Sequence, residues 1–262
     1  MIENNYHTHT YRCKHASGSD EDYVKAAIKA GFKTLGFADH TPWNFDSSFV
    51  STMRMEPKEL PGYIQSIRRL QKKYKNQINI KLGLECELYT RYLDWLKEIV
   101  KEYQVEYLIF GNHFYETEEH YPYFGSNCDS QEYFDLYVES TIKAMESDLF
   151  SYIAHPDLFM RSFNSFNKSC VEATRKICKA ANKHQIPLEY NIGYMKHNEQ
   201  HNIKSFPCDE FWQIAADEKC ITIIGYDAHT PEALTEKRYI TKALQRINQL
   251  GLKRTEQINF LH

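Results

Sequence analysis

The chain has 262 residues, of which 42% are hydrophobic and 26% are charged, and its formal net charge is −3. These values are ordinary for a globular protein, and they argue against a nucleic-acid partner because a nucleic-acid-binding surface usually carries a basic excess. No apolar run approaches the roughly 20 residues that cross a bilayer. We therefore expect a single cytoplasmic domain over residues 1–262, without a membrane partner, and homo-oligomerisation stays open.

The seven cysteines include no Cys-x-x-Cys pair. An odd number of cysteines in a chain without a secretory signal predicts reduced thiols in a cytoplasmic protein. Cys13 and Cys86 adjoin candidate metal ligands, but we do not expect them to bind metal, because histidines and carboxylates already suffice.

Short β-rich segments alternate with longer segments of helical periodicity. The predicted strands span residues 2–7, 33–38, 78–84, 106–111, 151–154, 187–192 and 221–226. The predicted helices span residues 20–31, 57–75, 91–104, 130–147, 168–184, 208–218 and 231–249. Ser19, Pro57 and Pro231 mark helix starts, and Gly31 marks a helix end. This α/β alternation predicts a parallel sheet that closes into a barrel, with an open doubly wound sheet as the alternative.

Histidines and carboxylates recur where the predicted strands end. The set comprises His7, His9, His15, His40, Glu85, His113, His155, Asp227 and His229. Because the carboxyl ends of barrel strands converge on one face, we expect these side chains to lie together there. Imidazole and carboxylate suit zinc, manganese and iron, and nine donors exceed the needs of one tetrahedral ion. The sequence therefore predicts two or three divalent metal ions at the C-terminal face of the strands.

Two pairs of candidate ligands have a spacing of two residues, which places both side chains on one face of a strand. His7 and His9 form the first pair, and Asp227 and His229 form the second, at the opposite end of the chain. In a closed barrel the last strand neighbours the first, so the two pairs should meet. The long connections at 39–56 and 112–129 follow candidate ligands, and we expect them to wall the substrate pocket.

Short motifs follow one another in a fixed order: HTHT at 7–10, His15 with the following ASGS, ADHTP at 38–42, GLE at 83–85, GNHF at 111–114, AHPD at 154–157 and YDAHT at 226–230. In combination they resemble the polymerase and histidinol phosphatase (PHP) superfamily. MRME at 53–56 and AHPDLFMR at 154–161 look most like its monofunctional histidinol-phosphate phosphatases. The resemblance implies a distorted (β/α)7 TIM-like barrel with a trinuclear site of zinc, iron or manganese, acting in histidine biosynthesis.

The resemblance also implies how the ligands divide among three divalent metal ions. One ion would lie on His7, His9, Glu85 and Asp227, with Glu85 bridging; a second on His15, His40 and His229; and a third on Glu85, His113 and His155. We expect a hydroxide that bridges two ions to attack phosphorus directly. Asp227 or, alternatively, His229 would be the general acid for the departing alkoxide.

Three basic side chains are candidate substrate contacts. Arg161 and Arg54 are predicted to contact phosphate oxygens, because a guanidinium can bind two of them at once, and Lys196 is a further candidate. The predicted reaction is the hydrolysis of L-histidinol phosphate, a small phosphate monoester, to L-histidinol and phosphate. The enzymatic alternatives are a PHP-type phosphodiesterase, nuclease or nucleotide phosphatase with the same metal cluster. A metal-binding regulatory protein is the alternative outside the enzymes.

Overall fold

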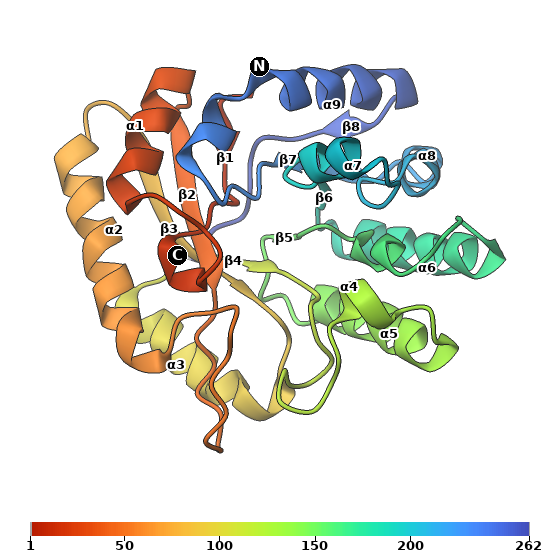
Figure 1. Ribbon diagram of the computed structural model, residues 1–262, viewed down its shortest axis with the longest axis horizontal. Helices are drawn as coiled ribbons and strands as arrows, with labels where there is room; N and C mark the ends of the chain where they lie inside the picture. The colour runs from red at the N-terminus through yellow and green to blue at the C-terminus, as the bar shows by residue number, and fades with distance from the viewer. Residues whose placement is uncertain (1, 262) are drawn as a thin grey trace.

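In the computed structural model, which describes residues 2–261, eight parallel strands form one sheet in sequence order (Figure 1). The strands are β1 (Asn4–Asn5), β2 (Thr34–His40), β3 (Asn79–Cys86), β4 (Tyr107–Phe110), β5 (Tyr152–Ile153), β6 (Leu188–Asn191), β7 (Ile221–Gly225) and β8 (Lys253–Arg254). The first seven lie inside or within two residues of the predicted strands. The short β8 was not predicted. Because the strand order never reverses, the alternative of a doubly wound sheet is wrong.

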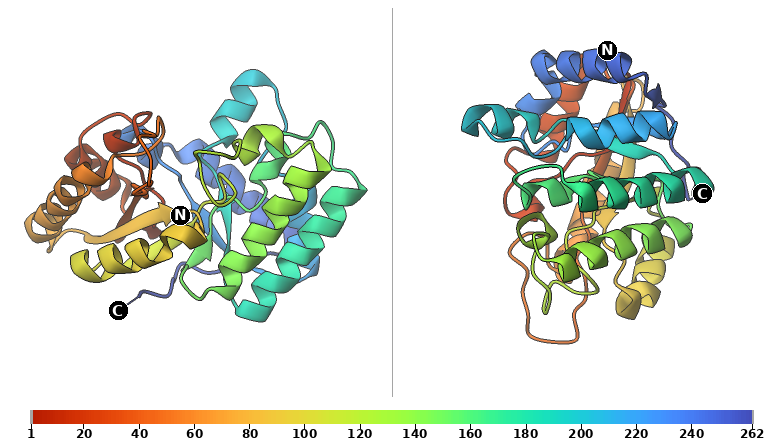
Figure 2. Two further views of the ribbon diagram at one scale, coloured as in Figure 1. Left: turned by 90° about the horizontal axis from the view of Figure 1, so that it is seen from below. Right: turned by 90° about the vertical axis from the view of Figure 1, so that its right-hand side faces the viewer.

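The sheet is strongly curled (Figure 2), and the segments that follow β1 and β7 meet. An isolated parallel bridge joins Thr8, beyond β1, to Ala228, beyond β7. The N–H of His9 donates to the carbonyl oxygen of Ala228 over 3.0 Å, and the N–H of Ala228 donates to that of His7 over 3.2 Å. This contact confirms the predicted TIM-like fold and brings the two terminal ligand pairs together.

Helices surround the curled sheet on its outer side (Figures 1 and 2). They are α1 (Asp20–Ala30), α2 (Leu60–Tyr74), α3 (Leu93–Tyr103), α4 (Phe124–Asn127), α5 (Gln131–Glu146), α6 (Lys168–His184), α7 (Met195–His201), α8 (Asp209–Asp217) and α9 (Lys237–Leu250). Five 3-10 helices supplement them: η1 (Tyr11–Cys13), η2 (Pro57–Glu59), η3 (Thr90–Tyr92), η4 (Leu158–Arg161) and η5 (Pro231–Thr235). Among residues 2–261, no helix combines the length and apolar character that a bilayer span requires.

The predicted helix boundaries were right where side chains cap the helix. Ser19 accepts the N–H of Asp22, Asp22 accepts the N–H of Ser19, and Gly31 ends α1 with a φ of 89°. The predicted helix at 231–249 is two elements, because the backbone of Glu236 is extended between η5 and α9. The short helices α4 and α7 lie in connections for which no helix was predicted.

A small apolar cluster fills the inside of the curled sheet. It consists of Tyr6, Ala38, Tyr107, Ile109, Tyr152, Ala154, Ile223 and Ile258. The ring of Tyr107 lies against Gly36 and Gly83, where an added Cβ would be 2.2 Å and 2.4 Å from its atoms. Strand side chains alternate between two faces, so His40 and Glu85, two residues beyond Ala38 and Gly83, also point inward. The apolar interior of the barrel therefore ends in a layer of polar side chains.

Candidate metal centre

The structure brings all nine candidate ligands together at the carboxyl ends of the strands. Eight of them line one cleft of about 510 Å³, namely His9, His15, His40, Glu85, His113, His155, Asp227 and His229. The ninth, His7, is fully buried beneath the cleft and contacts Glu85 and Asp227. Residues from the two long connections, Thr52 and Met53 from the first and Phe114 and Glu118 from the second, form part of the walls.

Glu85 lies at the centre of the group. Its two carboxylate oxygens lie within 3.6 Å of ring nitrogens of five histidines: His7 at 3.5 Å, His9 at 3.5 Å, His40 at 3.0 Å, His113 at 3.6 Å and His155 at 2.9 Å. Burial opposes the ionisation of Glu85, but the nearby imidazoles of His113, His7 and His40 hold its pKa well below its usual range. Glu85 is therefore a buried anion in contact with histidines from four other segments.

Three donor atoms have the mutual separations expected around one metal ion. Nε2 of His7 and Nε2 of His9 lie 3.2 Å apart, and Oδ1 of Asp227 lies 3.4 Å and 3.1 Å from them. Since zinc-to-ligand bonds are about 2.0–2.1 Å, the edge of a tetrahedral site is about 3.4 Å. The three atoms therefore fit one ion of the size of zinc. Glu85 lies beside them, with Oε1 at 3.5 Å from Nε2 of His7 and Oε2 at 3.5 Å from Nε2 of His9.

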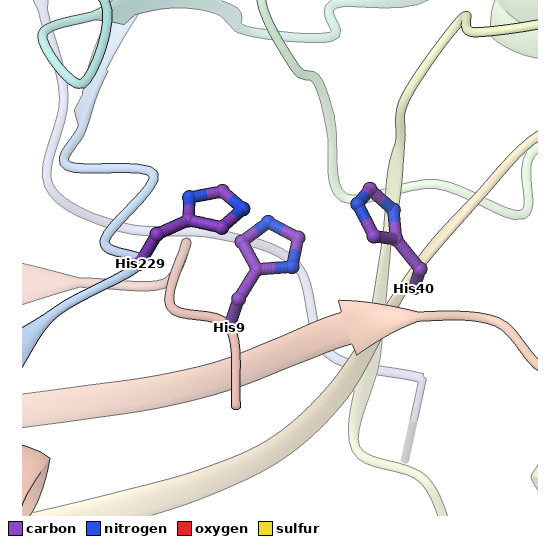
Figure 3. A group of neighbouring side chains, drawn as sticks. All are labelled: His9, His40 and His229. Atoms are coloured by element: carbon purple, nitrogen blue, oxygen red, sulfur yellow. The ribbon is translucent and has the colours of Figure 1, made fainter. Parts of the chain in front are cut away.

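A second group of imidazoles lies on the open side of the cleft. His9, His40 and His229 offer ring nitrogens within 4.8 Å of one another, and they come from the ends of three different strands (Figure 3). Nε2 of His229 lies 3.0 Å from Nε2 of His15. Burial lowers the pKa of His40 to about 3 and that of His229 to about 4, and burial also lowers the pKa of His15. The imidazoles of His15, His40 and His229 are therefore neutral, as ligands must be.

Several buried donor atoms have no hydrogen-bond partner. Three of them belong to the candidate ligands: Nδ1 of His40, Oε2 of Glu85 and Nδ1 of His155. The first two lie 3.0 Å apart, close enough for one cation to contact both. An unsatisfied buried polar atom is costly, and a coordinated cation removes that cost. The donor set therefore fits divalent cations.

Two candidate ligands have strained backbone conformations. The φ of His155 is 29° and the φ of Asp227 is 46°, which is uncommon for residues other than glycine. Such conformations cost about 1–3 kcal/mol each and cluster at functional sites. Both residues stand two positions beyond the end of a strand, His155 after β5 and Asp227 after β7, and their side chains line the cleft.

Three carboxylates that the sequence analysis missed hold the outer nitrogens of candidate ligands. Glu189 lies 2.8 Å from Nδ1 of His7, Asp39 lies 3.4 Å from Nδ1 of His9, and Glu87 lies 3.0 Å from Nδ1 of His113. A carboxylate at Nδ1 fixes the proton on that nitrogen and leaves the lone pair of Nε2 for a cation. The signal in the sequence was a charged residue inside or directly after a buried strand.

Of the predicted substrate contacts, Arg161 lies in the cleft. Its Nη1 donates to the hydroxyl of Tyr123 over 3.1 Å, and its guanidinium lies 4.9 Å from the ring centre of Tyr194. Lys196 lines a neighbouring cavity of about 260 Å³, which shares Gly193, Asp227 and His229 with the cleft. The guanidinium of Arg161 lies against aromatic rings, which hold its positive charge at the edge of the candidate metal centre.

Arg54 lies elsewhere than expected. Its side chain is 1% exposed and does not line the cleft. Nη1 and Nη2 donate to Glu87 over 3.0 Å and 2.9 Å, Nε donates to Glu118 over 2.7 Å, and Nη1 also donates to the carbonyl oxygen of Thr41. Because its guanidinium is buried and hydrogen-bonded to two carboxylates, Arg54 is not placed to bind a phosphate in the cleft. The expectation that Arg54 contacts phosphate is corrected accordingly.

The seven cysteines are buried and free. Sγ of Cys13 lies within 4.8 Å of ring nitrogens of His15 and His229. Burial raises the pKa of this thiol to about 12, which disfavours the thiolate that binds metals. We therefore keep Cys13 outside the candidate ligand set.

Comparison with known proteins identifies the family. Residues 5–193 match the family model of the PHP domain. A Deinococcus radiodurans protein named "Probable histidinol-phosphatase" is 27% identical over 233 residues, which cover 86% of this chain and 85% of that protein. The histidinol-phosphatase of Bacillus subtilis is 25% identical over 256 residues, which cover 87% of this chain and 94% of the relative.

The fold has a counterpart among crystal structures. Histidinol phosphate phosphatase from Lactococcus lactis, complexed with zinc, L-histidinol and phosphate, superimposes with a TM-score of 0.72 and 20% sequence identity, and the match covers 98% of each chain. At this identity the likeness concerns the fold. Because the family model matches 189 of the 262 residues, from 5 to 193, the chain belongs to the PHP domain family.

Proposed function

We propose that this protein is a metal-dependent phosphomonoesterase that hydrolyses L-histidinol phosphate to L-histidinol and phosphate. The observation that carries the proposal is the convergence of nine donor side chains, Glu85 among them, with Arg161 in the same cleft. Two relatives that span most of the chain are named for this activity, which supports the choice of substrate.

The proposed centre holds three divalent ions, with zinc, iron and manganese as the candidates. His7, His9 and Asp227 would hold one ion together with Glu85. His113 and His155 would hold another, also with Glu85, and His15, His40 and His229 would hold the third. The short distances from Glu85 to the first two sets support its assignment to both ions. When bound, the ions offset the charge of the phosphate and lower the pKa of the attacking water.

Asp227 is the proposed proton carrier. Burial opposes its ionisation, but His7 and His229 hold its pKa well below its usual range, so it begins the reaction as a carboxylate. It accepts the proton that the attacking water loses and gives it to the oxygen of the departing alkoxide. His229, whose Nδ1 lies 3.4 Å from Oδ1 of Asp227, is the alternative carrier. No covalent phosphoenzyme is required.

Arg161 is the proposed phosphate contact. It forms one hydrogen bond, to Tyr123, which leaves further N–H groups of the guanidinium for phosphate oxygens. Its guanidinium lies 5.4 Å from the ring centre of Tyr123 and 4.9 Å from that of Tyr194. These contacts restrict its motion, so little conformational freedom is lost on binding.

We further propose that the chain acts as one domain in the cytoplasm. The continuous strand order and the bridge between Thr8 and Ala228 support a single structural unit. The seven free cysteines support a reducing compartment.

The test is turnover by protein loaded with zinc or manganese. The phosphomonoesterase proposal predicts a kcat/KM for L-histidinol phosphate at least about a hundredfold above those for bis-p-nitrophenyl phosphate, a nucleoside monophosphate and a short single-stranded oligonucleotide. Preferred cleavage of a diester would contradict the proposal and favour a phosphodiesterase or nuclease. Absence of turnover with every substrate would favour a metal-binding regulatory protein.

A further inference from the structure

The charged side chains that line the cleft fall into two sets. Glu85, Asp227 and the histidines belong to the candidate metal centre. When these are set aside, the charged residues of the cleft wall are Glu118 and Arg161, within the part of the chain that the structure describes. A substrate with a phosphate and an ammonium group carries a negative and a positive charge. The guanidinium of Arg161 suits the phosphate, and the carboxylate of Glu118 suits the ammonium group.

Glu118 is held rigidly although it stands in a long connection. Its Oε2 accepts a hydrogen bond from Nε of Arg54 over 2.7 Å, and its Oε1 accepts one from the hydroxyl of Ser51 over 2.7 Å. The side chain is 7% exposed. Because each carboxylate oxygen can accept two hydrogen bonds, both retain an acceptor site. Glu118 is therefore pre-positioned and still able to bind a donor.

The charges around Arg54 do not balance. One guanidinium serves two carboxylates, since Arg54 also forms two hydrogen bonds with Glu87. Glu87 in turn lies 3.0 Å from Nδ1 of His113, a neutral imidazole when it binds a cation. The buried group of Arg54, Glu87 and Glu118 thus carries one net negative charge, and Glu118 is its member that lines the cleft. A cation in the cleft compensates this charge.

We propose that Glu118 determines substrate specificity by binding the ammonium group of the substrate, and that Arg54 is the positioning residue that holds it in place. This inference rests on the proposed hydrolysis of L-histidinol phosphate. The ammonium is the suitable partner because it stays protonated at neutral pH, whereas an imidazole with an ordinary pKa of about 6.5 is mostly neutral there.

The experiment pairs a variant of the enzyme with a variant of the substrate. Wild-type protein and Glu118→Gln are assayed with L-histidinol phosphate and with 3-(imidazol-4-yl)propyl phosphate, which lacks the amino group. The wild type should prefer the amine by about tenfold to a hundredfold in kcat/KM, as expected for a charge-assisted hydrogen bond. Glu118→Gln should reduce this preference to about twofold or less, mainly because the KM for L-histidinol phosphate rises.

Two further variants separate recognition from folding. Glu118→Asp keeps the charge and should retain part of the preference. Glu119→Gln is the matched control, because Glu119 bonds Ser47, Thr117 and Tyr92 and does not line the cleft. It should keep the preference of the wild type, and the metal content of all variants should match.

Specific outcomes would overturn the inference. If Glu118→Gln keeps the full preference, or if Glu119→Gln loses it equally, Glu118 does not recognise the amine. If the wild type hydrolyses both monoesters equally well, the inference fails while the phosphomonoesterase proposal stands. If the wild type hydrolyses neither monoester, the proposed function fails and the inference fails with it.

Discussion

At the scale of single residues, Glu85 is the position on which most of the proposed site depends. Its carboxylate faces five imidazoles, whereas His15 and His229 contact each other on the open side of the cleft. Removal of a shared ligand should weaken metal binding more than removal of a terminal ligand, because two ions lose a bond at once. The unequal importance of the nine ligands is therefore testable.

Glu85→Ala should lose metal and activity together, and it should lose more of both than His15→Ala. We expect less than about a hundredth of the wild-type kcat/KM, since such a change removes a ligand from two ions and unbalances a buried charge. Metal content by elemental analysis and phosphate release from L-histidinol phosphate provide the check. A Glu85→Ala protein with full metal content and near-normal turnover would require a different bridging ligand.

Arg161→Met should reduce kcat/KM for L-histidinol phosphate by about tenfold to a hundredfold while metal content stays constant. The change removes charge-assisted hydrogen bonds to phosphate, at about 1.4 kcal/mol for each factor of ten. Arg161→Lys should recover part of the loss, because lysine lacks the planar fork. Unchanged kinetics would move phosphate binding to Lys196, whereas loss of metal would indicate a structural role.

The sequence predicts individual residues well where strand geometry dictates them. His7, His9, Asp227 and His229 could be paired because a spacing of two places side chains on one strand face. Arg54 could not be placed in this way. It and its partner Glu118 lie in separate long connections, and nothing local in the sequence specifies that these connections pack together. The same holds for Glu189, whose contact with His7 depends on the curl of the whole sheet.

At the scale of elements, the tight contact between β2, β3 and β4 supports the site from below. Tyr107 of β4 lies over Gly83 of β3 and Gly36 of β2, and its hydroxyl donates to the carbonyl oxygen of Tyr6 over 2.7 Å. Glu85 is two residues beyond Gly83 on the same face of β3. A change in this packing therefore affects both stability and the position of Glu85.

Gly83→Ala should destabilise the protein, because the added Cβ would lie 2.4 Å from Cζ of Tyr107. Overpacking of this kind costs about 1–3 kcal/mol, which should lower the Tm by roughly 2–12 °C in a chain of this size. Gly62→Ala is the matched control, since Gly62 lies in α2 with no atom within 4 Å of an added Cβ. The Tm of Gly62→Ala, measured by thermal unfolding, should equal or exceed that of the wild type. Equal Tm values for the two variants would contradict the proposed packing of Tyr107.

Elements were predicted reliably where a capped helix or a buried strand gave a periodic signal. Ser19 and Gly31 bound α1 because side-chain capping and a left-handed backbone are local properties. The helices α4 and α7 span only four and seven residues, too few for a periodic pattern. Strand β8 consists of two exposed residues that pair with β7, so its sequence lacks the apolar signal of a buried strand.

At the scale of the whole molecule, the fold brings carboxylates and imidazoles from distant parts of the chain into one buried group. Burial opposes the protonation of His9, but hydrogen bonds to Asp227 and Asp39 and the negative charges of Asp227 and Glu85 raise its pKa to about 9. A cation must displace that proton. Closure of the barrel, which brings Asp227 to His9 from the opposite end of the chain, thereby links metal binding to pH.

Metal binding should release protons at any pH below about 9, and apparent metal affinity should fall as the pH falls. The sign follows because a raised pKa means that the metal-free site holds more protons than the loaded site. Calorimetric titration with zinc in two buffers of different ionisation enthalpy measures the number released. Heat that does not depend on the buffer would contradict this linkage.

The central claim is that nine side chains, spread along the chain from His7 to His229, form one centre for three divalent ions. The most direct test is a crystal structure of zinc-loaded protein with anomalous scattering recorded on both sides of the zinc absorption edge. The account predicts three zinc peaks in the cleft, two of them in contact with Glu85 and one held by His15, His40 and His229. A single peak, or peaks that leave Glu85 without a metal, would contradict it.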